Sequence, residues 1–183
     1  MVKKFLFDTI QSVALALGIF AIVYFIFLQP HEVKGKSMEP NFQDKEYLLT
    51  DKFSYKIGAP KRGEVIVFAA PPTRQEEFIK RIIGLPGDTV SIKDGGVLVN
   101  DKQLQEGYLP QTTLTFGGST LHEGEKIALA NNEYFVLGDN RSHSQDSRYF
   151  GVIKRSDILG KAWLIYWPPK KVGFVRQVIY AGF

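Results

Sequence analysis

The sequence carries three short segments whose side chains could do chemistry, and the first is Gly35-Lys36-Ser37-Met38-Glu39-Pro40. A glycine before the serine and a proline after it favour a turn that exposes the Ser37 hydroxyl. A serine hydroxyl becomes an effective nucleophile only when a nearby base removes its proton. By itself this segment predicts a turn serine, and the base must be sought elsewhere.

The second segment, residues 78–88, contains a lysine between apolar neighbours. If residues 77–83 form a strand, the side chains of Phe78, Lys80 and Ile82 point to one face of it. Burial there would disfavour the Lys80 ammonium and lower its pKa, which makes the amine a candidate base. The alternative is a lysine at a sheet edge, or one whose ammonium reaches water.

The third segment, residues 138–148, reads Gly-Asp-Asn-Arg-Ser-His-Ser-Gln-Asp-Ser-Arg. So many short polar side chains in succession predict a loop that is held in shape by its own hydrogen bonds. A plain surface turn is the alternative interpretation.

The element that precedes all three segments is a long apolar run without a charged residue between Asp8 and Glu32. Within residues 10–28, sixteen of nineteen residues are apolar. As a helix this run would be roughly 28 Å long, close to the hydrocarbon core of about 30 Å. A buried core helix is rarely apolar all round, and a cleaved signal peptide needs a small-x-small site that residues 29–33 lack. The run predicts an uncleaved membrane anchor.

The charges beside this run leave its orientation open. Lys3 and Lys4 precede it, partly offset by Asp8, while Lys34 and Lys36 follow it. The positive-inside rule counts Lys and Arg near the ends of a span, and here the numbers nearly tie.

The remaining residues, 31–183, have the pattern of a mainly β fold, so we expect strands, and not a helix-rich fold, to position the three segments. A hairpin is indicated by apolar stretches on both sides of Asp94-Gly95-Gly96. Residues 100–132 are polar with weaker periodicity and look like an excursion from the main sheet. We predict strands at residues 64–68, 77–83, 90–92, 97–99, 134–137 and 162–167.

Composition excludes several classes of function. The chain has 183 residues and no cysteine, which rules out a cysteine nucleophile, a disulfide scaffold and thiolate metal sites. Its net charge of +4, with both signs scattered, is too small to indicate nucleic-acid binding. The histidines His31, His122 and His143 lack metal-ligand spacing and are interpreted as ordinary surface residues. We expect no metal and no cofactor.

In this order, and behind an N-terminal anchor, the three segments resemble those of a bacterial type I signal peptidase. The resemblance covers nearly the whole chain and is weakest at residues 100–132. It implies a membrane-bound serine endopeptidase with a Ser–Lys dyad that removes signal peptides on the outer face of the cytoplasmic membrane. It also implies an anchor at residues 1–30 with the N-terminus inside, and an extracytoplasmic catalytic domain at residues 31–183. Residues from about 93 to 133 would be a smaller inserted, cap-like segment.

The resemblance also assigns roles to single residues. Ser37 resembles the nucleophile, Lys80 the general base, and Ser144 a serine that hydrogen-bonds to the lysine and orients it. Where some relatives carry a serine that helps the oxyanion hole, this chain has Gly35, so backbone N–H groups, chiefly that of Ser37, would have to act. A structural polar network is expected from Arg81, Asp139, Asp146 and Arg148.

By the same resemblance, a pocket for small side chains before the cut would be formed by Val33, Met38, Phe42, Phe78 and Ile79. Implied partners are signal-peptide-bearing pre-proteins and membrane lipid, with the secretion machinery as a further candidate and no nucleic acid. Aromatic residues that could touch the lipid surface, or serve as core, are Trp163, Tyr166, Trp167 and Phe174.

Two alternatives remain from the sequence alone. One is a processing peptidase of the pilus or conjugation type, which would share the Ser–Lys chemistry. The other is a catalytically silent, membrane-tethered β module that binds exported chains. Loss of Ser37 or Lys80 would favour the silent module, and both residues are present.

Overall fold

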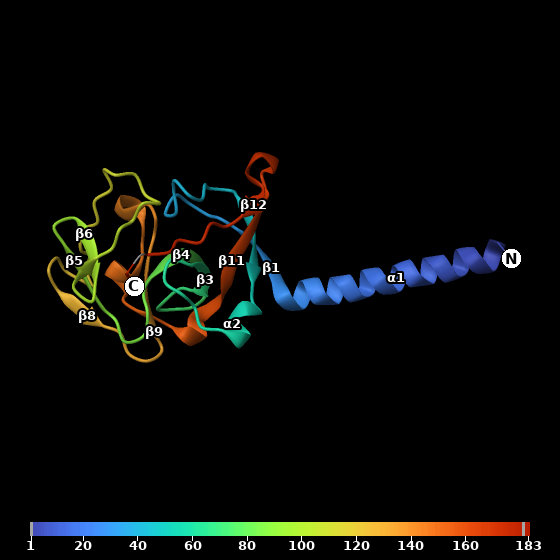
Figure 1. Cartoon of the computed structure of the whole chain (residues 1–183), viewed down its shortest axis with the longest axis horizontal. Helices are drawn as coiled ribbons and strands as arrows, with labels where there is room; N and C mark the ends of the chain where they lie inside the picture. Colours follow the sequence, from blue (N-terminus) through green and yellow to red (C-terminus); the bar gives the residue numbers. More distant parts are fainter. Residues whose placement is uncertain (1, 181) are drawn as a thin grey trace.

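The computed structural model describes residues 2–180 and 182–183. Helix α1, Val2–Phe27, extends away from the rest of the molecule as a single rod (Figure 1). Its residues Lys3–Ala21 are long and apolar enough to cross a membrane, and none of that stretch is buried against the protein. The helix is therefore a candidate membrane span, as the apolar run predicts.

The helix passes into the first strand without a linker. Helix α1 ends at Phe27, and strand β1, Leu28–Glu32, begins at the next residue. The Lys52 N–H donates to the Phe27 carbonyl over 3.0 Å, and the rings of Phe27 and Phe53 meet edge to face, 5.0 Å apart. These contacts fix the junction to the domain.

The main sheet has eight strands in the order β1-β2-β11-β3-β4-β9-β10, with β12 paired to β11. Every pairing in it is antiparallel. Its other strands are β2 Tyr47–Asp51, β3 Val65–Ala69, β4 Glu77–Gly84, β9 Glu133–Leu137, β10 Ile153–Lys154, β11 Ile158–Trp167 and β12 Gly173–Phe174.

A second, four-stranded sheet lies at the end of the molecule opposite α1 (Figure 1). Its order is β7-β6-β5-β8. The predicted hairpin is confirmed: Asp94 and Gly95 form its two-residue loop, with φ angles of 54° and 75° that suit a type I′ turn. The strands are β5 Thr89–Lys93, β6 Gly96–Val99, β7 Lys102–Gln103 and β8 Lys126–Ala128.

The fold is mainly β, as predicted, and each predicted strand is present. The sequence did not predict β1, β2, the first residues of β11 or the short strands β7, β8, β10 and β12. Pro30 lies inside β1, where a proline argues against a strand, but β1 is an edge strand and can accommodate it. Helix outside α1 is short: α2 Ser54–Ile57, α3 Ser147–Phe150, and 3₁₀ turns at Arg141–His143, Arg155–Asp157 and Pro169–Lys171.

The two faces of the main sheet bury different apolar clusters, because side chains alternate along each strand. On β3, Val65 and Val67 join one cluster, whereas Ile66 and Phe68 join the other. The cluster with Val65 also holds Val33, Met38, Phe42, Leu48 and Ala162. A third cluster packs the second sheet against β4 and β9.

Candidate active site

Ser37 lies on a turn between β1 and β2 that is pinned at both ends. At its start, Val33 exchanges backbone hydrogen bonds with the two residues just before β2: its N–H donates to the Glu46 carbonyl (2.7 Å) and its carbonyl accepts from the Lys45 N–H (2.8 Å). The Gly35 N–H donates to the Asp44 carboxylate over 2.7 Å, and Gly35 has a φ of 81°, which favours glycine. The turn leaves Ser37 half-buried.

Lys80 reaches the serine from β4. Its Nζ lies 2.8 Å from Ser37 Oγ and 2.9 Å from the Ile79 carbonyl oxygen, and the residue is only 3% exposed. Burial lowers the pKa of Lys80 from 10.5 to about 8, against the opposing effect of the Asp146 and Asp139 carboxylates. An amine with a pKa of about 8 is neutral in part just above neutral pH, and the neutral form can accept a proton from a hydroxyl in contact with it.

The polar loop at residues 138–148 packs against the serine turn. The Asn140 backbone N–H donates to the Ser37 carbonyl over 3.0 Å, and the Asn140 side-chain amide donates to the Lys36 carbonyl over 3.1 Å. A Cβ on Gly138 would lie 2.5 Å from the Ser37 carbonyl oxygen, so only glycine fits at this approach. The loop therefore holds in place the backbone of the turn that carries Ser37.

A buried ion pair joins this loop to β4 beside the lysine. The Arg81 guanidinium donates to both oxygens of Asp139, over 2.9 and 2.6 Å, and both side chains are at most 3% exposed. The Asn41 amide donates to the same carboxylate over 2.9 Å, which ties in the serine turn as well.

A second buried ion pair holds the loop to itself. The Arg148 guanidinium donates to both oxygens of Asp146 over 2.8 Å, and Asp146 also accepts the Gly138 N–H over 3.0 Å. Arg148 further donates to the Arg141 carbonyl over 2.7 Å. The structure thus brings together Arg81, Asp139, Asp146 and Arg148 in buried ion pairs next to Lys80.

Ser144 lies near this network but does not make the hydrogen bond expected of it. The residue is 6% exposed, and its Oγ has no hydrogen-bond partner among the described residues. Lys80 Nζ instead contacts Ser37 and the Ile79 carbonyl. Ser144 Oγ packs against Gly138, where an added Cβ would lie 2.1 Å from it.

Ser37 and Lys80 open into a cleft between β1 and the start of β4. Three of the five residues expected around the substrate line it: Val33, Phe78 and Ile79. The other two, Met38 and Phe42, are not among its lining residues; they are 0% and 3% exposed and pack beneath Val33 in the apolar core.

His31 also lines this cleft, so its interpretation as an ordinary surface histidine is wrong. Its side chain is 10% exposed, and its Nε2 lies 3.0 Å from a Glu77 carboxylate oxygen. On the other side of the ring, Nδ1 lies 2.9 Å from the Thr50 hydroxyl. The sheet curls so that β1 and β4 meet here, although three strands separate them in the sheet order. Such a contact has no signal in the local sequence.

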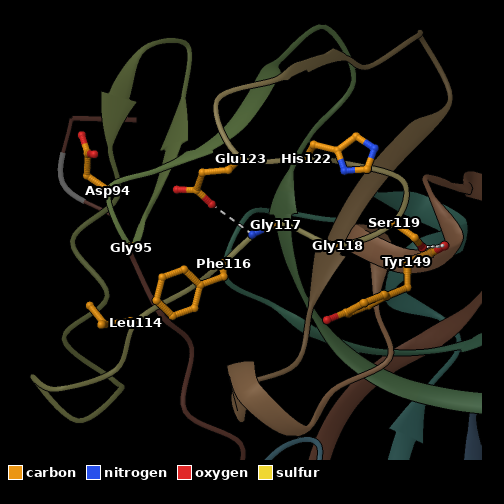
Figure 2. A pocket seen from close by; sticks show the side chains of 10 residues that line it. All are labelled: Asp94, Gly95, Leu114, Phe116, Gly117, Gly118, Ser119, His122, Glu123 and Tyr149. Atoms are coloured by element: carbon orange, nitrogen blue, oxygen red, sulfur yellow. Dashed lines mark hydrogen bonds between the residues drawn. The ribbon is translucent and has the colours of Figure 1, made fainter.

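A second, shallower hollow lies over the small sheet (Figure 2). Leu114, Phe116 and Tyr149 line it, and the Glu123 carboxylate accepts the Gly117 N–H at its rim over 3.1 Å. None of the residues predicted to be catalytic or to bind substrate lines this hollow, so the cleft with Ser37 and Lys80 is the candidate active site.

This site suggests a serine hydrolase, and comparison with known proteins agrees with that class. The family described as "Signal peptidase, peptidase S26" matches residues 6–167. The chain therefore belongs to the signal peptidase family S26, and it is a serine endopeptidase, as the sequence predicts.

Similar proteins carry related names. The chain is 36% identical to "Signal peptidase IB" of Staphylococcus aureus over 177 residues, which cover 91% of this chain and 92% of the relative. It is also 36% identical to "Probable signal peptidase I-2" of Synechocystis sp., covering 92% of this chain and 74% of the relative. A crystal structure of a signal peptidase I from Enterococcus faecalis is 31% identical, with a TM-score of 0.48, and covers 57% of this chain and 97% of that one.

Proposed function

We propose that this protein removes N-terminal signal peptides from exported pre-proteins, with Ser37 as nucleophile and Lys80 as general base. The observation that carries the proposal is the 2.8 Å contact between Ser37 Oγ and the buried Lys80 Nζ. Neutral Lys80 takes the hydroxyl proton while Oγ attacks the scissile carbonyl. The ammonium then protonates the leaving amine, and a water activated by Lys80 hydrolyses the acyl-enzyme.

In this proposal, a backbone N–H group of the turn that carries Ser37 stabilises the oxyanion. Gly35 offers no hydroxyl, so the Ser37 N–H is assigned as the chief donor to the developing negative charge. The hydrogen bonds from Asn140 to the carbonyls of Lys36 and Ser37 support this role, because they hold the backbone of the turn in place. Gly35 and Ser144 are assigned supporting roles at the site.

The substrate is proposed to bind as an added strand on the open edge of β4. Residues 77–81 pair with β3 on one side, whereas pairing with β9 begins only at Arg81, so residues 77–80 keep a free edge within the described chain. An extended peptide can complete this edge with main-chain hydrogen bonds. Val33 and Ile79 then meet its side chains and leave room only for small ones.

Cleavage is expected to speed up about tenfold between pH 7 and pH 9. The pKa of Lys80 is about 8, and the fraction of neutral amine rises through that value as pH increases. The measurement is kcat/KM for a pre-protein between pH 6 and 10, with circular dichroism at each pH as the control for folding. A flat profile, or a midpoint near the unshifted 10.5, would contradict the role of Lys80.

The proposed function is tested with pre-proteins that differ only at the residue before the cut, position −1. Ala is expected to be cleaved about 5- to 150-fold faster than Leu or Phe, because overpacking a formed apolar pocket costs about 1–3 kcal/mol. The same changes at −2, which points away from the cleft in an extended peptide, serve as the control. Cleavage after Phe at the rate for Ala would refute the pocket.

Helix α1 is proposed to anchor the protein in the cytoplasmic membrane. In this arrangement residues 1–30 form the cytoplasmic tail and anchor, and residues 31–183 form the catalytic domain on the outer face, with residues from about 93 to 133 as a cap-like insertion. Further candidates for lipid contact are the exposed aromatic residues Trp163, Tyr166, Trp167 and Phe174, which are 37%, 38%, 52% and 69% exposed.

A further inference from the structure

We propose that Glu77, paired with His31, forms a substrate subsite for a basic side chain five residues before the cut, at position −5. The inference rests on the proposed function and extends it upstream of the small-residue pocket. It makes Glu77 a specificity-determining residue of the cleft, and it assigns a role to the contact between His31 and Glu77, which the catalytic steps do not use.

The geometry of the cleft sets the direction of the bound peptide. Four successive antiparallel pairings, β1 to β2, β2 to β11, β11 to β3 and β3 to β4, make β1 and β4 parallel to each other. His31 is the fourth residue of β1, which follows α1 directly, and Glu77 is the first residue of β4. Their contact places the start of β4 at the end of the cleft that is nearer to α1 along the chain. A peptide that arrives from the anchor side therefore runs past Glu77 first and Lys80 last.

The lining of the cleft is apolar near Ser37 and polar at the end where His31 and Glu77 meet. Val33, Leu48 and Val67 line it near Ser37 and belong to one apolar cluster, against which Ile79 packs. Two residues before Ile79, on the same face of β4, stands Glu77. The apolar part ends there, and the His31–Glu77 pair follows.

Successive side chains of an extended peptide point to opposite faces, and this alternation decides which substrate position meets the His31–Glu77 pair. Side chains at −1, −3 and −5 point to one face, and −2 and −4 to the other. If −1 and −3 contact the apolar part, −5 points to the same side about 13 Å upstream of the cut. Glu77 is three residues, about 10 Å, before Lys80, so its carboxylate lies within reach of a side chain at −5.

The charge at this end of the cleft favours a basic side chain. Three carboxylates, Glu32, Glu76 and Glu77, line the cleft, and the His31 ring lies against Glu77. The lysines of the lining are Lys34 and Lys36, which follow Glu32 along the chain towards Ser37, and Lys80. The Glu77 side chain is 44% exposed, so it is open to a ligand while it contacts His31. A lysine at −5 gains a carboxylate partner, whereas a glutamate there meets like charges.

The experiment uses the full-length protein in detergent and pre-proteins with the same Ala-x-Ala site that carry Lys, Ala or Glu at −5. Lys is expected to exceed Glu about 5- to 30-fold in kcat/KM, as two partly exposed charge interactions of opposite sign combine. Glu77→Gln should reduce this ratio several-fold, and Glu77→Lys should invert it. Inversion distinguishes a contact with substrate from a merely structural role.

Two controls keep the readout specific. Glu123→Gln makes the same change of charge and shape at an exposed site over the small sheet, and its Lys-to-Glu ratio should equal that of the unaltered protein. The same charges placed at −4 should give a ratio near one. A ratio within twofold of one at −5, a ratio that Glu77→Gln leaves unchanged, or the larger effect at −4 overturns the inference. Failure to cleave even the Ala substrate overturns the proposed function itself.

Discussion

Replacing Ser37 by alanine, or Lys80 by methionine, is expected to lower kcat/KM for pre-protein cleavage by about a thousandfold or more. Alanine removes the attacking oxygen, and methionine fills the buried volume of the lysine stem without a base. Without the amine 2.8 Å away, the hydroxyl keeps its proton and is a poor nucleophile. Because the two residues act as one unit, the double variant should be no slower than the slower single variant.

The measurement is cleavage in detergent at pH 9, where Lys80 is mostly neutral, with far-UV circular dichroism to confirm the fold. Matched controls make the same exchanges outside the cleft: Ser119→Ala and Lys126→Met, both at exposed positions. They should retain nearly full activity. A Ser37 or Lys80 variant that keeps a tenth of the activity would falsify the dyad.

Replacing Asp139 by alanine is expected to lower the free energy of unfolding by about 3–5 kcal/mol, the range found when one partner of a buried ion pair is removed. The Arg81 guanidinium would stay in an environment where it is 3% exposed and lose both of its carboxylate contacts. The Asn41 amide would lose a partner too. For a chain of this size the melting temperature should fall by roughly 6–20 °C.

Thermal unfolding followed by circular dichroism measures this change. The control is Lys126→Ala, which breaks the ion pair with Asp101; both of its side chains are more than half exposed. An exposed pair of this kind contributes about 0–1 kcal/mol. Equal small losses in both variants would show that the Arg81–Asp139 pair does not hold the loop to β4.

Local patterns in the sequence were sufficient for α1 and for six of the strands, but not for β1 or β2. Alternating and continuous apolar runs predicted strands such as β3, and Asp94-Gly95 predicted a hairpin loop, because both signals arise within a few adjacent residues. The proximity of Ser37 and Lys80 came from the resemblance to a family. The structure places the two residues together across 43 positions of sequence, and their catalytic roles stay predictions.

The contacts that complete the site could not be predicted, because they join distant parts of the chain. Asn140 holds the carbonyl of Lys36 across 104 positions. The pair between His31 and Glu77 depends on the curl of the whole sheet, which no single segment specifies. The packing of distant parts of the chain also decides whether an apolar residue lines the cleft or lies in the core. Met38 packs in the core with Val33 for this reason.

The direct junction between Phe27 and Leu28 has a consequence for where a substrate can be cut. With no linker and with Phe27 held by Lys52 and Phe53, the domain cannot rise or sink relative to the end of its helix. In a membrane Ser37 would then lie at a constant distance above the lipid, and the helix would set that distance. The scissile bond of a substrate held in the same bilayer would have to lie at that height. The distance of a peptide bond from the membrane would then select the site of cleavage before any side chain is recognised.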